Sequence, residues 1–147
     1  MVEFALAMPV ALLLILGIME MGWLFFSYAS LATGARAAAR YAAAVGTSAG
    51  GEPYYQDTSG ICSEARRFAG LAGAQPSVAI HYDTGPGTTQ SPAYACGSAS
   101  TYSADLGTRV KVEVQATYRP LEPLVPLPNL VLSASAVRTI ITGVPIG

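Results

Sequence analysis

The chain has 147 residues, of which 52% are hydrophobic and 12% charged; its formal net charge is −1 and its mean hydropathy is +0.42. The eight Lys and Arg residues are scattered and form no basic stripe that would neutralise phosphates, which argues against nucleic acid as a partner. The composition is that of an exported protein with one apolar end. The length allows one modest domain beside that end.

The residues from Phe4 to Phe26 form an apolar segment in which only Glu20 is charged. At about 1.5 Å per helical residue, the segment matches a hydrocarbon core of about 30 Å and can cross a bilayer once. A signal peptide would begin with basic residues, but no Lys or Arg precedes Arg36. We therefore expect the segment to remain in the working protein.

Two carboxylates accompany the apolar segment. An ionised Glu20 is costly near the middle of a membrane, so either it stays protonated or close to the interface, or it meets a polar group on another helix in a bundle of copies. Glu3 suits the positive end of the helix dipole. In a packed bundle it would also bind the amino terminus of a neighbour.

An alanine-rich stretch follows and favours continuation of the helix to about Val45, for a total length of about 65 Å. No membrane is that thick, so the second half of the helix projects into water or is covered by protein. Arg36 and Arg40 share one face of this half, where they would meet phospholipid headgroups or acidic groups of a neighbouring subunit. We expect residues 1–45 to form a transmembrane or filament-core helix.

Helix-disrupting and small residues interrupt this helix at four positions. Pro9 removes a backbone hydrogen bond and favours a bend. Gly17, Gly22 and Gly34 either loosen the helix further or allow other helices to approach closely. The sequence leaves these two explanations open.

Residues 46–147 have the pattern of a β-rich globular head. After a loop over 46–60, the spacing predicts a short helix over 61–72 with Ser59 as its cap, and then strands over 77–82, 109–118 and 131–142. In the clearest strand, 109–118, valines alternate with charged and polar residues, which is typical of a half-buried antiparallel strand. The prolines of 120–128 favour an extended connection that covers a sheet edge or a neighbouring subunit.

The only two cysteines, Cys62 and Cys96, both lie in the head, and in an exported domain such a pair predicts a disulfide. A metal site is the weaker alternative because there is no Cys-x-x-Cys and the single histidine, His81, lies on a predicted strand. No nucleophile accompanies that histidine, and no phosphate-binding glycine loop is present. The sequence therefore predicts no catalytic site, no metal and no cofactor.

Taken in order, several segments resemble the TadE-like pilins and pseudopilins of tight-adherence (Tad) pili, a branch of the type IV filament superfamily. The amino-terminal part is similar in order and spacing through Glu3, Pro9, the leucine run, the Gly-Ile-Met-Glu-Met-Gly motif at 17–22 and the alanines of 35–43. The carboxy-terminal part is similar in its strand at 110–118, proline-rich linker and strand at 132–138. The middle, from about 46 to 108, carries no matching motif.

The resemblance implies a precursor that a prepilin peptidase cuts after a glycine in a short basic leader, storage in the inner membrane, and extraction into a filament by an ATPase-driven machine. Glu3 would then correspond to the acidic residue that neutralises a neighbour's amino terminus during assembly. In the family this glutamate usually lies a little further from the cleavage site. Either cleavage is shifted, or this sequence does not begin at the mature terminus.

We therefore expect an α+β, pilin-like fold with a long amino-terminal helix and a disulfide-bonded head. The expected function is that of a pilin that polymerises with itself through its apolar helix into an extracellular pilus for adhesion or surface motility. Glu3, Glu20 and Pro9 are the candidate assembly residues. The alternative is a membrane-anchored minor pseudopilin that primes or tips a pilus, or an anchored binding module.

Overall fold

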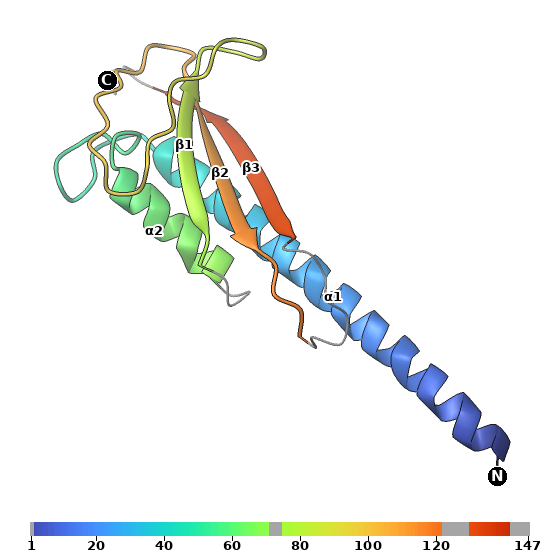
Figure 1. Ribbon diagram of the computed structural model, residues 1–147. Coiled ribbons are helices and arrows are strands. Elements are labelled where there is room, and N and C mark those ends of the chain that lie inside the picture. The colour runs from blue at the N-terminus through green and yellow to red at the C-terminus, as the bar shows by residue number, and fades with distance from the viewer. Residues whose placement is uncertain (1, 71–74, 122–129, 142–147) are drawn as a thin grey trace.

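The computed structural model describes residues 2–70, 75–121 and 130–141, and within residues 2–6 it describes only the backbone. Helix α1 (Val2–Ala42) extends far beyond the head at its amino-terminal end, and α2 (Thr58–Ala69) lies beside its second half (Figure 1). Strands β1 (Ser77–Asp83), β2 (Arg109–Thr117) and β3 (Val131–Thr139) form one antiparallel sheet in the order β1-β2-β3. The predicted α+β class with a long amino-terminal helix is confirmed.

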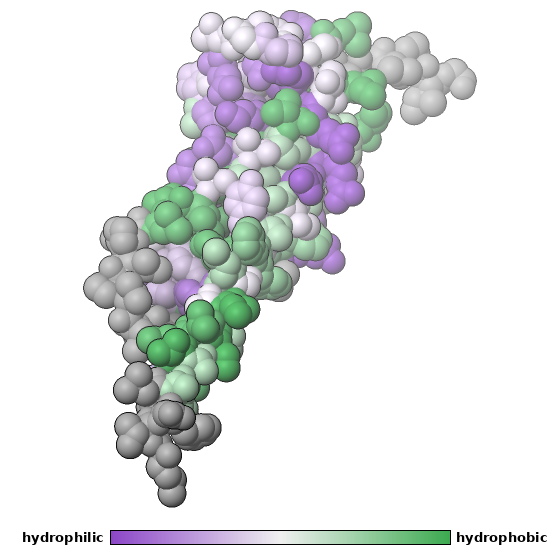
Figure 2. Space-filling model, turned by 90° about the vertical axis from the view of Figure 1, so that its right-hand side faces the viewer, coloured by the Kyte–Doolittle hydropathy of each residue, from purple (hydrophilic) through white to green (hydrophobic). Residues whose placement is uncertain are grey.

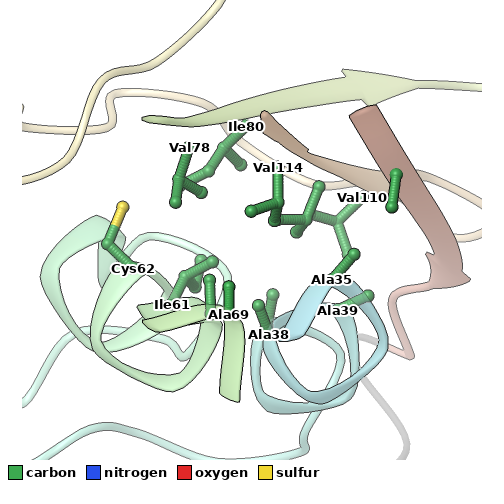
Figure 3. Packing of buried hydrophobic residues seen from close by; sticks show 14 of the residues in the cluster. Ala35, Ala38, Ala39, Ile61, Cys62, Ala69, Val78, Ile80, Val110 and Val114 are labelled. Carbon is green, nitrogen blue, oxygen red and sulfur yellow. The ribbon is translucent and has the colours of Figure 1, made fainter. Parts of the chain in front are cut away.

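The sheet packs with one face on the two helices, and this contact forms the core. In β2, Val110, Val112 and Val114 are fully buried and alternate with partly exposed Lys111 and Glu113, as the sequence pattern predicts. Figure 3 shows the valines of the sheet pointing toward the alanines of α1 and the buried face of α2.

The second half of α1 belongs to this core. One face of it is completely buried and consists of Leu31, Ala35, Ala38, Ala39 and Ala42. These positions recur at the spacing of a single helix face, and their small side chains let the helix approach both the sheet and α2. The sequence predicted that this half either projects into water or is covered by protein. The structure shows that protein covers one face of it.

Several element boundaries differ from the sequence-based expectation. Helix α1 ends at Ala42 rather than about Val45, β1 extends to Asp83, and β2 ends at Thr117. Strand β3 ends at Thr139, although the backbone N–H of Ile140 still donates to the carbonyl of Thr108 at 2.8 Å, which is the next pair in the β2–β3 register. Most of the predicted proline-rich connection, residues 122–129, lies outside the described residues.

Helix α2 begins earlier than predicted, and its cap is Asp57 rather than Ser59. The Asp57 carboxylate accepts hydrogen bonds from the backbone N–H of Gly60 at 2.8 Å and from the hydroxyls of Ser59 and Tyr41 at 2.7 Å each. Partial burial works against ionisation, but these three donors keep the pKa of Asp57 below its ordinary value. The cap thus also joins the end of α1 to the start of α2.

The predicted disulfide between Cys62 and Cys96 is present, with the two Cα atoms 5.7 Å apart. It joins α2 to the long connection between β1 and β2. Backbone hydrogen bonds between Ile80 and Tyr94 hold that connection against the free edge of β1. The ring of Tyr82 stacks on Tyr102 at a centroid distance of 4.4 Å, so the connection is packed rather than loose.

Candidate assembly surface

In the described part of the structure, the side chains of α1 from Ala7 to Phe26 are apolar apart from Glu20, and most of them are exposed. The most exposed are 55–71% accessible and include Leu13, Leu14, Ile15, Ile18 and Phe25. Figure 2 shows hydrophobic residues gathered over the lower described part of the helix, whereas hydrophilic residues predominate on the head. A helix that is hydrophobic all round is stable only when lipid or other protein surrounds it.

Length and composition allow this helix to cross a membrane. Only 6% of its most apolar 18-residue stretch is buried inside the molecule. The low burial sets it apart from the central helix of a water-soluble domain. We call the described side chains from Ala7 to Phe26 the assembly surface.

The glycines of α1 divide into two kinds according to their surroundings. A Cβ atom built on Gly34 would lie 2.5 Å from the carbonyl oxygen of Ala65, so this glycine is required where α1 and α2 cross. At Gly17 and Gly22, a Cβ atom would meet no atom of the described residues within 4 Å. The packing of the single chain therefore explains Gly34 but not the two glycines of the assembly surface.

The head reaches the assembly surface at a small polar junction centred on Glu20. The Glu20 carboxylate accepts hydrogen bonds from the hydroxyl of Tyr118 and, at 3.1 Å, from the backbone N–H of Leu121. One turn further along the helix, the Trp23 indole N–H donates to the carbonyl of Arg119 at 3.1 Å. These three contacts attach the segment after β2 to the helix.

The junction gives Glu20 a partner within its own chain, whereas one of the two sequence-based hypotheses placed a partner on another helix and the other left the acid protonated or close to the interface. The carboxylate is only partly exposed, and each of its oxygens has a donor. An apolar helix tolerates the acid at this position because the head supplies these donors. Sequence reasoning did not identify Tyr118, Trp23 or Arg119 as members of a site.

Comparison with protein families gives a match at the amino-terminal end. Residues 1–40 match the model of a family described as TadE-like protein. The amino-terminal helix of this chain is TadE-like. No curated protein and no solved structure matches the chain. The TadE-like family is associated with the Tad pilus and is not known for enzymatic activity.

The match covers the candidate assembly residues Glu3, Pro9 and Glu20 together with Arg36 and Arg40. The TadE-like helix continues through Pro9 without interruption. The backbone at Glu3 is helical, and its side chain lies outside the described part of the structure. Thus of the two acids, only Glu20 has a described environment.

Arg36 and Arg40 are exposed on the outer face of the TadE-like helix, opposite the buried alanines. At about 1.5 Å per residue, Arg36 lies roughly 20 Å beyond Trp23 along the helix axis. Within the described ranges, neither arginine forms an ion pair. Both side chains are therefore exposed at the level of the head and lie outside the assembly surface.

A shallow depression of about 190 Å³ continues the assembly surface between the TadE-like helix and α2. It is lined by Phe26, Ala29, Ser30, Thr33 and Phe68.

In the described residues, no group of three His, Cys, Asp or Glu side chains has the geometry of a metal site. His81 has a structural environment, since its Nδ1 atom lies 3.1 Å from the carbonyl oxygen of Ser91.

Proposed function

We propose that the chain is a structural pilin, whose copies polymerise through the assembly surface into an extracellular Tad pilus. The observation that carries this proposal is the uncovered apolar half of α1, which projects from a folded, disulfide-bonded head. Identical helices packed side by side would bury that surface. A repeated head-to-tail contact that does not close into a ring produces a helical filament.

Gly17 and Gly22 support packing of helices against helices. Among the residues that the structure describes, neither glycine has a neighbour that would exclude a side chain. Small residues let helix backbones approach closely in apolar surroundings, where tight packing replaces the hydrophobic effect as the source of affinity. In this proposal both glycines face the α1 helices of other copies.

The charged residues of α1 have separate roles in the proposed filament. Glu3 neutralises the amino terminus of a neighbouring copy, as the family resemblance implies. Glu20 fixes the head to the helix through Tyr118. Arg36 and Arg40, exposed well beyond the assembly surface, meet acidic groups of neighbouring heads.

Before assembly, the same apolar half holds the subunit in the inner membrane. Prepilin peptidase and the pilus assembly machinery are the partners that the family resemblance implies. The pilus would serve adhesion or surface motility.

A second candidate is a minor pseudopilin that remains in the membrane or caps a pilus. It is favoured by one observation, namely that the apolar half alone satisfies a single membrane span. Electron microscopy of material sheared from cells, with mass spectrometry of the filaments, separates the two functions. A pilin is the main filament component. A pseudopilin is scarce in the filaments or absent from them, and such a result would refute the proposal.

A further inference from the structure

Strand β3 lies at the outside of the sheet and pairs with β2 alone, over nine consecutive residue pairs without a bulge (Figure 1). The backbone N–H of Tyr118 donates to the carbonyl of Leu130 at 2.8 Å. That of Ile140 donates to the carbonyl of Thr108, also at 2.8 Å. Because such bonds recur at every second residue of an antiparallel pair, the even-numbered residues of β3 face β2. The odd-numbered residues direct their N–H and C=O groups to the opposite side.

We call these outward backbone groups the free edge; they belong to Val131, Ser133, Ser135, Val137 and Thr139. All five side chains are exposed, and within the described ranges none of the outward groups has a hydrogen-bond partner. Natural proteins usually protect such an edge with lysine, proline or a bulge. The one charged residue of β3 is Arg138, near its end. The free edge is therefore open to an extended chain.

The opposite side of the sheet is covered by the chain itself. Ile80 of β1 and Tyr94 exchange two backbone hydrogen bonds, at 2.9 and 3.2 Å, in an antiparallel bridge. Residues 91–95 thus follow β1 as a short outer strand. At the exposed Ala93, alternation directs the backbone N–H and C=O groups away from β1. The 91–95 segment therefore offers a second, shorter open edge.

The two open edges match in direction. Strands β1 and β3 both run antiparallel to β2, and the 91–95 segment runs antiparallel to β1. When a second copy stands beside the first in the same orientation, its 91–95 segment is therefore antiparallel to β3 of the first copy. Both apolar halves of α1 then point the same way. Each copy keeps one edge open for the next, so the contact can repeat along a filament.

Pairing of two β3 strands with each other does not meet these requirements. Antiparallel β3 strands in one sheet, with the helices on a shared face, send the two apolar halves in opposite directions. Such halves cannot enter one membrane from the same side or lie parallel in one filament. A symmetric pair also uses both free edges and ends the growth. The 91–95 segment of another copy is therefore the occupant that fits the free edge.

Apolar side chains beside the two edges support this contact. Leu132 and Ala136 of β3 pack against the core but are only partly buried, and so is Tyr94 beside the other edge. Alternation places all three on the helix side of the sheet, where Tyr94 contacts the ring of Tyr82. Pairing of the edges brings Tyr94 of one copy beside Leu132 or Ala136 of the next, which reduces the exposed apolar surface of both.

We propose that the free edge of β3 binds the 91–95 segment of a second copy, which joins the sheets of neighbouring heads edge to edge around the pilus. The inference rests on the proposed pilin function and specifies how the heads of the filament meet. Backbone hydrogen bonds supply the contact, and the helices of all heads lie on the same face of the joined sheet.

The sheet also sets the register of this contact. Tyr94 pairs with Ile80, which lies at the level of Ala136 across the sheet. In two heads at equal height, Ala93 of one copy therefore lies opposite Val137 of the other. A stagger between neighbours moves this pairing by two residues for each step of about 7 Å, from one exposed position of the free edge to the next.

The test uses pili from cells that produce the full, oxidised chain with two added cysteines. Ala93→Cys is combined, in separate variants that cover the possible staggers, with Ser133→Cys, Ser135→Cys, Val137→Cys or Thr139→Cys. A short bismaleimide then links cysteines of neighbouring heads. We expect at least one variant to give a ladder of dimers, trimers and longer products on a denaturing gel. The matched control, Ala93→Cys with Gln115→Cys on the exposed face of the central strand, should stay monomeric.

Single variants identify the occupant of the free edge. Ala93→Cys alone and Ser135→Cys alone should stay monomeric under the same treatment. A cross-linked dimer from Ser135→Cys alone would show that β3 pairs with β3, and would overturn the assignment of the 91–95 segment.

Ser135→Pro tests the free edge by a second route. It removes an N–H that points away from β2, so the ladder within the head stays complete, and its ring obstructs an incoming chain. We expect pilus yield to fall roughly tenfold or more, because each contact loses a backbone hydrogen bond. The head should still unfold at the wild-type temperature. Ser135→Ala keeps the N–H and should assemble normally.

Absence of a ladder from every cysteine pair in intact pili overturns the edge contact and leaves the pilin function standing. A normal pilus yield from Ser135→Pro has the same meaning. If Ser135→Pro lowers the melting temperature of the head, the cross-linking result decides. Sheared filaments that lack the wild-type chain overturn the pilin function itself, and the edge contact with it.

Discussion

The hydroxyl of Tyr118 donates a hydrogen bond to the carboxylate of Glu20, which lies 98 residues earlier in the chain. This bond joins the end of β2 to the apolar half of α1, close to the boundary between the assembly surface and the head. The helix and the head are therefore joined at this point as well as through the backbone of α1.

Loss of the Glu20 carboxylate should loosen this junction. For Glu20→Leu, which removes the acceptor for both Tyr118 and Leu121, we expect a decrease of roughly 1 to 3 kcal/mol in the free energy of unfolding of the head. Tyr118→Phe should cost about 1 to 2 kcal/mol because only one bond is lost.

Glu20→Gln is the matched control for these two variants, since an amide keeps the shape and one acceptor oxygen. It should lie between wild type and Glu20→Leu. Denaturant unfolding in detergent micelles measures all three changes. If Glu20→Leu were as stable as wild type, the junction would have no structural role.

Two glycines of α1 should respond in opposite ways to the same substitution. Gly34→Ala places a methyl group against the backbone of Ala65 and should destabilise the head by about 1 to 3 kcal/mol. Gly17→Ala meets open space in the single chain and should leave the unfolding of the head unchanged while reducing pilus yield.

Thermal unfolding of the purified subunits, together with counts of sheared pili, tests the pair. Normal yield of pili from Gly17→Ala would argue against close helix packing at that position.

Removal of the disulfide should destabilise the head by about 3 to 4 kcal/mol, because the bond closes a loop between residues 34 positions apart. The double variant Cys62→Ala, Cys96→Ala should therefore unfold at a lower denaturant concentration. A reducing agent should lower the midpoint of wild type to a similar value and leave the double variant unaffected. A wild-type midpoint that does not respond to full reduction would contradict the prediction.

The ion pair between Asp83 and Arg109 should make stability depend on pH in the acid range. The two side chains meet at 2.6 Å, and the bond from the Arg109 guanidinium lowers the pKa of the nearly buried Asp83 carboxyl. The stabilisation is therefore complete above the unfolded pKa of about 3.9 and is lost as the pH falls through the folded value.

Asp83→Asn should lower the melting temperature at pH 7, and the difference from wild type should narrow toward pH 2. A difference that stays constant over this range would show that the charge of Asp83 contributes nothing.

Glu3→Ala should impair pilus formation while the protein remains in the membrane. The reason is the loss of the proposed neutralisation of a neighbour's amino terminus. Glu52→Ala, which removes an exposed carboxylate of the head, is the control and should form pili normally. Immunoblots of the membrane fraction and of the sheared pilus fraction measure membrane retention and pilus yield. A normal pilus yield from Glu3→Ala would refute the role of this residue.

Short-range patterns were sufficient to predict much of the fold. The alternation of β2 and the apolar run of α1 depend on neighbours within a few residues, and the disulfide was predictable because only two cysteines exist. The caps and ends of elements were less predictable. The cap of α2 is Asp57 rather than the expected Ser59; its carboxylate accepts from the Gly60 backbone N–H and also from Tyr41 of a different helix, a contact that no local pattern predicts.

The sequence by itself determined that an apolar helix would lead into a β-rich head, since hydrophobic periodicity is a local property of the chain. Only the tertiary structure decided that protein covers the second half of that helix and what Glu20 contacts. Those outcomes depend on how the sheet and α2 pack on Leu31–Ala42 and on where β2 ends beside Trp23. Contacts across such distances arise from the packing of the whole head, and no local pattern encodes them.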